Sequence, residues 1–152
     1  MSDVIFMQTA LQLANQAAIQ GEIPVGAVVV YNNKIIACGA NCCIAKHDPT
    51  AHAEIVALRV AAQYLRNYRL TNCDLYVTLE PCMMCAGAII NARIRRLFIG
   101  ASSAKIGMNT MTNCSVKNYF AAPTLNHRVT TETGILGEQC SNLLKNFFQE
   151  RR

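Results

Sequence analysis

Apolar residues near the start of the chain recur with the 3.6-residue period that is typical of an amphipathic helix. Ile5, Leu13 and Ala17 fall on one face of such a helix, and this pattern predicts a helix over Asp3–Ile19. Gly21 follows directly and is expected to end it, because glycine readily takes the left-handed backbone conformation found after helices.

Two short runs rich in β-branched residues come next, separated by a pair of asparagines. The runs are Val25–Tyr31 (VGAVVVY) and Lys34–Gly39 (KIIACG), and Asn32-Asn33 stands between them. Asparagine tolerates the positive φ angles that a two-residue hairpin turn requires. The sequence therefore predicts a β-hairpin.

Helix and strand patterns alternate through the middle of the chain. A helix of about four turns is expected within Ala51–Tyr68, with Thr50 as its cap. Asp74–Leu79 is predicted to be a strand, Met83–Asn91 a helix and Arg96–Gly100 a strand. Strand, helix and strand at this spacing predict a parallel crossover.

The last third of the chain is less regular. Ser102–Pro123 shows no clear period, whereas Cys140–Phe148 (CSNLLKNFF) predicts a closing helix. The chain shows no repeat and no interdomain linker, so residues 1–152 are interpreted as one domain. The predicted fold class is α/β, a three-layer α/β/α sandwich whose helices cover a mixed central sheet of about five strands.

Composition narrows the class of protein. The chain has 152 residues, of which 52% are apolar and 15% charged, so intrinsic disorder is not expected. No apolar run reaches the length of a membrane span, and Asp3 lies where a signal peptide needs positive charge, so we expect a cytoplasmic protein without a membrane segment. Most cysteines should then be reduced, and Cys38, Cys73 and Cys140 are expected to be small buried hydrophobes.

The net charge of +5 and the pI of about 8.9 mildly favour an acidic partner such as a nucleic acid. Several basic residues could follow a phosphate backbone: Arg93, Arg95, Arg96, Lys105, Arg128, Lys145, Arg151 and Arg152.

The segment TLEPCMMCAGAII places Cys82 and Cys85 at the start of a predicted helix. Both sulfurs of such a pair lie on one side, and the helix N-terminus favours their thiolate forms. By itself the pair is compatible with a redox couple, half of a structural zinc site, or part of a catalytic metal centre.

A histidine and a glutamate favour the third interpretation. His52 and Glu54 lie at the start of the preceding predicted helix, and one crossover brings successive helix starts side by side. One imidazole and two thiolates give three ligands, with no obvious fourth, and an open position is typical of catalytic zinc sites, where water binds. The combination H-x-E and P-C-x-x-C is the signature of zinc nucleobase deaminases, in which the glutamate carries protons.

On these motifs the chain resembles the bacterial tRNA-specific adenosine deaminases, which convert the wobble adenosine of an anticodon into inosine. The resemblance extends over GEIPVGAVVV, HDPTAHAEIVALR, TLEPCMMCAGAIINARIRRLFIGA, LNHRV and GILGEQCSNLLKNFF. It implies a cytidine deaminase-like fold, one Zn²⁺ per subunit and a homodimer that binds a tRNA anticodon stem-loop.

The resemblance also implies roles for individual residues. His52, Cys82 and Cys85 would be the zinc ligands, and Glu54 would be the catalytic proton shuttle. Four further residues would bind the substrate: Asn41 by hydrogen bonding to the flipped nucleoside, Pro24 and Val25 as an apolar wall, and Ala53 through its backbone N–H.

Possible tRNA contacts are Ser103, Lys105, Arg128, Phe147, Phe148, Arg151 and Arg152. Core packing is the simpler role for at least one residue of the Phe pair. Ser103 is a departure, because many family members have A-x-D-x-K-x-G here and this chain has Ser in place of the acid. Loss of that acceptor and its charge predicts changed tRNA preference or weaker discrimination between RNA and DNA.

Two other functions stay open at this stage. The same zinc centre with a closed pocket would suit a deaminase of a free nucleobase or nucleoside, of guanine or cytosine type. A zinc-stabilised RNA-binding or scaffold subunit would need the metal but not Glu54.

Overall fold

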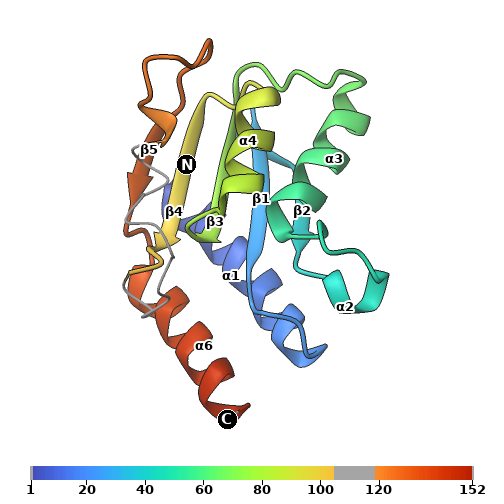
Figure 1. Ribbon diagram of the computed structural model, residues 1–152, viewed down its shortest axis with the longest axis vertical. Helices are drawn as coiled ribbons and strands as arrows, with labels where there is room; N and C mark the ends of the chain where they lie inside the picture. Colours follow the sequence, from blue (N-terminus) through green and yellow to red (C-terminus); the bar gives the residue numbers. More distant parts are fainter. Residues whose placement is uncertain (1, 105–118, 152) are drawn as a thin grey trace.

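A mixed five-stranded sheet forms the centre of the computed structural model, which describes residues 2–104 and 119–151 (Figure 1). The strand order is β2-β1-β3-β4-β5. Antiparallel pairing joins β1 to β2 and to β3, whereas β3, β4 and β5 run parallel. The strands are β1 (Gly26–Tyr31), β2 (Lys34–Ala40), β3 (Cys73–Leu79), β4 (Arg96–Ala101) and β5 (Thr130–Thr133).

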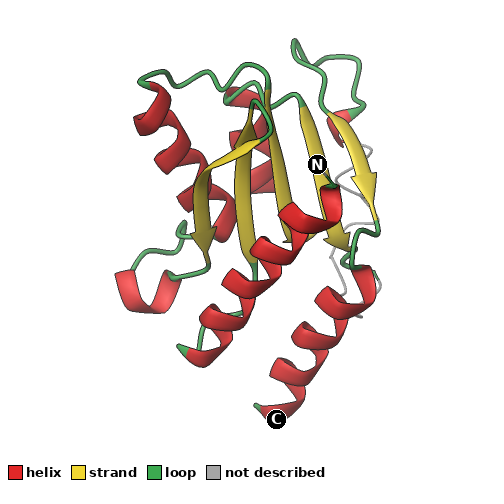
Figure 2. Cartoon of the chain, turned by 180° about the vertical axis from the view of Figure 1, so that it is seen from behind, coloured by secondary structure: helices red, strands yellow, loops and turns green. Residues whose placement is uncertain are grey.

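Helices cover both faces of this sheet and make three layers, as predicted. The described helices are α1 (Asp3–Ile19), α2 (Cys43–Lys46), α3 (Ala53–Leu65), α4 (Met83–Asn91) and α6 (Gly137–Glu150). α3 and α4 lie on one face (Figure 1), and α1 and α6 lie on the other (Figure 2). No helix in residues 2–104 and 119–151 has both the length and the apolar character needed to cross a bilayer.

The hairpin and the central strand follow directly from the residue pattern. Asn32 and Asn33 have φ angles of 49° and 62°, the two positive values that a tight hairpin turn needs. β1 is buried on both faces, since Val29 packs in the cluster under α3 and α4 while Val28 packs in the cluster under α1. Because helices cover both faces of this strand, residues of both faces are apolar, and its sequence is a continuous apolar run.

Glycine allows α3 to approach the sheet closely. A Cβ atom built at Gly39 on β2 would lie 2.3 Å from the Ala53 carbonyl oxygen, well inside any real contact. The first turn of α3 therefore rests directly on the β2 backbone. This contact fixes the helix end that carries the candidate site.

Several sequence expectations are refined or wrong. The parallel crossover from β3 through α4 to β4 is confirmed. The residue that caps α3 is His52 and not Thr50, whose hydroxyl instead donates to the Asp48 carboxylate at 2.7 Å. Cys38 is exposed on β2 rather than buried, whereas Cys73 and Cys140 are buried as predicted.

Two elements were not predicted. α2 lies in a stretch interpreted as a loop, and the short edge strand β5 has no alternation of apolar and polar residues. The irregular Ser102–Pro123 segment falls largely outside the described residues, as do Lys105 and Arg152.

Candidate metal and catalytic centre

Three potential metal ligands converge where α3 and α4 begin. His52 caps α3 and Cys82 caps α4, and Cys85 lies in the first turn of α4. The His52 Nδ1 atom is 3.6 Å from the Cys82 sulfur and 3.4 Å from the Cys85 sulfur. The three ligand atoms all lie within 4.8 Å of one another, so the crossover brings together the residues that the sequence selected.

The two thiols differ in pKa, so that Cys82 loses its proton far more readily than Cys85. The pKa of Cys82 is lowered to about 5, mainly because the Cys85 thiol stabilises its thiolate, with help from the first-turn backbone N–H groups and from His52. The pKa of Cys85 is raised, because its proton is held by the Cys82 sulfur and burial disfavours its charge. A cation bound between the sulfurs would displace that proton and take its place.

The donor set and its spacing fit a tetrahedral metal ion. A tetrahedral ion bonded to nitrogen at about 2.0 Å and to sulfur at about 2.3 Å separates those two ligand atoms by about 3.5 Å. The two nitrogen–sulfur distances in this site are 3.6 Å and 3.4 Å. Among the described residues, His52, Cys82 and Cys85 are the His, Cys, Asp or Glu side chains whose ligand atoms lie close enough together to hold one metal ion.

Glu54 lies beside these ligands in the first turn of α3 and is buried, with 4% of its surface exposed. Burial raises the pKa of its carboxyl to about 7, because a desolvated carboxylate loses its hydration, although its own backbone N–H and His52 act in the opposite direction. The carboxyl also contacts the Cys85 thiol. A carboxyl group with a pKa near neutrality can both accept and donate a proton in one reaction cycle.

The four predicted substrate-binding residues lie on three segments that hydrogen bonds join. The Asn41 backbone N–H donates to the Val25 carbonyl at 3.1 Å, and the Ala53 N–H donates to the Asn41 side-chain oxygen at 2.7 Å. Pro24 precedes Val25 in the chain, and both are buried. In this structure the Ala53 N–H is thus bonded to the Asn41 side chain rather than left open for a substrate, and the substrate role of the Asn41 amide nitrogen stays a prediction.

Sequence reasoning missed a buried carboxylate that holds this region together. Glu22 has 3% of its surface exposed, and its two oxygens accept the backbone N–H groups of Ile44 and Ala45 at 3.0 and 2.9 Å. It therefore caps α2, the short helix that follows Asn41. The acid lies about twenty residues before the helix it caps, so no local sequence signal indicates the pairing.

Replacement of Glu22 by glutamine is expected to destabilise the fold. Glutamine has one acceptor oxygen, so one of the two backbone N–H groups loses its partner, at a cost of about 1–3 kcal/mol. Urea unfolding should show this loss, while the matched change Glu138→Gln at an exposed site on α6 should cost less than about 0.5 kcal/mol. Equal unfolding midpoints for the two variants would contradict this role of Glu22.

The predicted tRNA contacts lie in different parts of the molecule. The Ser103 backbone N–H donates to the Glu80 carboxylate at 3.1 Å, which holds the start of that loop close to Cys82, one of the candidate metal ligands. Arg128 donates to the carbonyl oxygens of Ala121 and Ala122, so its guanidinium braces the loop before β5.

The remaining predicted contacts lie on α6, across the sheet from α3 and α4. Phe147 is buried, which agrees with core packing for one residue of the pair, and Phe148 packs partly buried against it at an edge-to-face angle. The Arg151 guanidinium stands 3.6 Å from the centre of the Phe147 ring. No described contact places these three side chains beside the metal ligands.

Comparison with known proteins gives consistent matches over the full chain. A family model described as MafB19-like deaminase matches residues 1–152. The tRNA-specific adenosine deaminase of Haemophilus influenzae is 50% identical over 151 residues, which cover 99% of this chain and 85% of that protein.

Solved structures agree with this likeness. One comes from a study of A-to-I editing by tRNA:A34 deaminases at the wobble position; it superposes with a TM-score of 0.82 at 39% identity and covers 91% of this chain and 98% of its own. The guanine deaminase of Bacillus subtilis superposes with a TM-score of 0.68 at 34% identity and covers 100% of this chain and 94% of its own.

Proposed function

The chain belongs to the MafB19-like deaminase family, and on that premise we propose that it is a tRNA adenosine deaminase. It converts the wobble adenosine of a tRNA anticodon to inosine and releases ammonia. The observation that carries this proposal is the convergence of His52, Cys82 and Cys85 next to the buried carboxyl of Glu54. We assign residues 1–152 to a single zinc-dependent deaminase domain.

His52, Cys82 and Cys85 hold one Zn²⁺ in this proposal. Bound zinc lowers the pKa of a water molecule toward neutrality and so supplies hydroxide for hydrolysis. Two cysteines and a histidine suit zinc better than calcium or magnesium, which prefer oxygen ligands.

Glu54 moves the protons of the reaction. Its carboxylate takes a proton from the attacking water and delivers it to the ring nitrogen of adenine next to the reacting carbon. The oxygen then bonds to the carbon that carries the amino group. Glu54 then takes the remaining proton from that oxygen and passes it to the amino group, the carbon–nitrogen bond breaks to release ammonia, and the ring keeps a carbonyl oxygen at this position.

Other residues hold the base in place. Pro24 and Val25 provide an apolar surface for the ring, and the Asn41 amide nitrogen donates to the nucleoside while its oxygen stays bonded to Ala53. Bases in a single-stranded loop can be splayed out at the lowest cost in stacking and pairing, which suits an anticodon loop as substrate.

The decisive experiment is inosine detection in an anticodon stem-loop incubated with the purified protein. We expect inosine at the wobble position and ammonia release from the stem-loop, with no release from adenosine, guanine or cytosine. The likeness to a guanine deaminase makes a free-base activity the competing function. Ammonia release from free guanine without release from the stem-loop would favour it.

Ser103→Asp tests whether the departure from the family pattern affects substrate choice. The added carboxylate would lie next to Glu80, since the Ser103 N–H is bonded to that side chain. We expect the variant to favour RNA over DNA hairpins more strongly than the wild type, by severalfold in kcat/KM, because an acceptor for a ribose hydroxyl returns. An unchanged ratio of the two activities would remove Ser103 from the specificity determinants.

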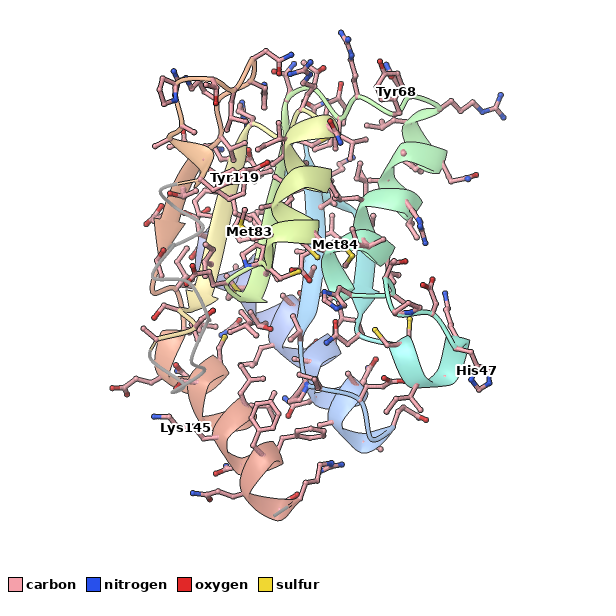
Figure 3. All side chains as sticks on the ribbon, in the orientation of Figure 1. His47, Tyr68, Met83, Met84, Tyr119 and Lys145 are labelled. Atoms are coloured by element: carbon pink, nitrogen blue, oxygen red, sulfur yellow. The ribbon has the colours of Figure 1, made fainter. Side chains whose placement is uncertain are left out.

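Assembly and compartment follow from the same proposal. We assign a homodimer, supported by exposed apolar side chains of α3 and α4, which are Val60, Tyr64, Met83 and Met84. Met83 and Met84, in the first turn of α4, are labelled in Figure 3. Such side chains are typical of surfaces that another protein covers. A tRNA substrate corresponds to a cytoplasmic enzyme.

A further inference from the structure

The starts of the three parallel strands form an edge of the sheet that is rich in arginine. Because β3, β4 and β5 run in one direction, the connections that lead into them meet at the same edge (Figure 1). These connections are residues 66–74, 92–96 and 119–131, and we call them the basic edge. Its arginines are Arg66, Arg69, Arg93, Arg95, Arg96 and Arg128.

The basic edge accounts for the net charge of the whole chain. It holds six of the 14 basic residues and one of the 9 acidic residues. The rest of the chain has eight basic and eight acidic residues, whose charges cancel. The acid is Asp74, which is bound by Arg95 at 3.1 Å and by Arg96 at 2.6 Å. Its side chain is 6% exposed, whereas those of the two arginines are about half exposed, so solvent meets mainly positive charge.

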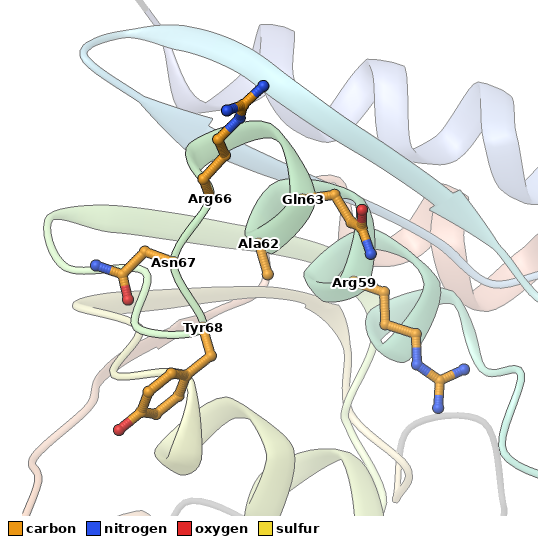
Figure 4. A pocket seen from close by; sticks show the side chains of 6 residues that line it. All are labelled: Arg59, Ala62, Gln63, Arg66, Asn67 and Tyr68. Carbon is orange, nitrogen blue, oxygen red and sulfur yellow. The ribbon is translucent and has the colours of Figure 1, made fainter.

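A groove at the end of α3 continues this surface. Its volume is about 850 Å³, and it is lined by Arg59, Ala62, Gln63, Arg66, Asn67 and Tyr68 (Figure 4). Tyr68 is 69% exposed, and the Arg69 guanidinium lies 5.6 Å from the centre of its ring. Exposed aromatic rings among arginines are typical of surfaces that bind RNA, since rings stack on bases while guanidinium groups pair with phosphates.

The basic edge is remote from the reaction centre. α3 has 13 residues, and at about 1.5 Å per residue its metal-binding start lies about 20 Å from Arg66 at its other end, where the groove meets the basic edge. Successive phosphates of a duplex strand advance by about 3.4 Å, so this distance corresponds to about six nucleotides. The basic edge therefore cannot bind the reacting nucleotide, but it can bind the same RNA elsewhere.

We infer that the basic edge is a second tRNA-binding surface, which contacts phosphates outside the anticodon loop. The inference rests on the proposed function, because that function supplies the acidic partner. Binding to phosphates releases counterions, so each arginine that contacts a phosphate contributes about fivefold to the affinity at 0.15 M salt. Each contact also steepens the dependence of affinity on salt by about one unit of slope.

The test compares two single variants that lose the same charge. Arg69→Ala removes an exposed arginine of the basic edge, and Lys46→Ala removes an exposed lysine of α2, outside that edge. Binding of full-length tRNA is measured across salt concentrations, and inosine formation is measured in a minimal anticodon stem-loop. The stem-loop reaction also shows that each variant is folded.

The edge variant should bind full-length tRNA about fivefold more weakly at physiological salt, with a salt slope shallower by about one unit, and should still edit the stem-loop. The lysine variant should bind tRNA nearly as the wild type does. Equal affinities for the two variants overturn the inference, as does binding of the edge to anionic lipid vesicles with no effect on tRNA. Absence of inosine with the wild type would instead refute the proposed function.

Discussion

Glu54→Gln is expected to abolish deamination while the metal stays bound. Glutamine nearly matches the size of the buried glutamate but cannot accept or deliver a proton at neutral pH. General acid–base catalysis is worth about 10²–10⁴-fold for one transfer, and Glu54 is assigned both transfers, so we expect a loss of about a thousandfold or more. Inosine formation in the stem-loop is the measurement.

Metal analysis makes that result specific. The glutamine variant should hold one zinc per chain, since Glu54 is not among the three converging ligands. Its thermal midpoint should not fall, because an uncharged amide avoids the desolvation that raises the pKa of the native carboxyl to about 7. Activity within tenfold of the wild type would instead support a zinc-stabilised RNA-binding subunit without hydrolytic function.

Cys85→Ser should remove the metal, the activity and part of the stability. The Cys85 sulfur is fully buried between its two partner ligands, and a serine hydroxyl is a far weaker zinc ligand at neutral pH. A metal ion that is present at a thousand times its Kd stabilises the folded chain by about 4 kcal/mol, and the variant loses this contribution. Zinc content and thermal unfolding, with and without a chelator, measure both effects.

Cys38→Ser is the matched control, because it makes the same chemical change at an exposed position on β2. It should keep one zinc per chain, full activity and the chelator-dependent shift in unfolding temperature. Cys85→Ser should show no such shift, since it has no metal to lose. A Cys85→Ser protein with one bound zinc and wild-type unfolding would exclude this cysteine from the ligand set.

The sequence by itself determined the long elements and the composition of the site. Apolar residues at helical spacing predicted the bounds of α1, although Ile5 is exposed and the buried face is formed by Phe6, Met7, Ala10, Ala14 and Ala17. The asparagine pair predicted the hairpin. Both signals act between residues close in the chain. The spacing of His52 and the cysteine pair selected the candidate metal ligands, and a single crossover brings their ligand atoms within 4.8 Å of one another. In each case the forces involved are local or follow from one connection.

Tertiary structure decided what depends on residues far apart. The short α2 helix exists where Glu22 caps it from a distant segment, and β5 is held by pairing with β4 rather than by a pattern of its own. The raised pKa of Glu54 requires burial between two helices, which no residue spacing specifies. Likewise, arginines scattered between positions 66 and 128 become one charged surface only because three parallel strands start at the same edge of the sheet.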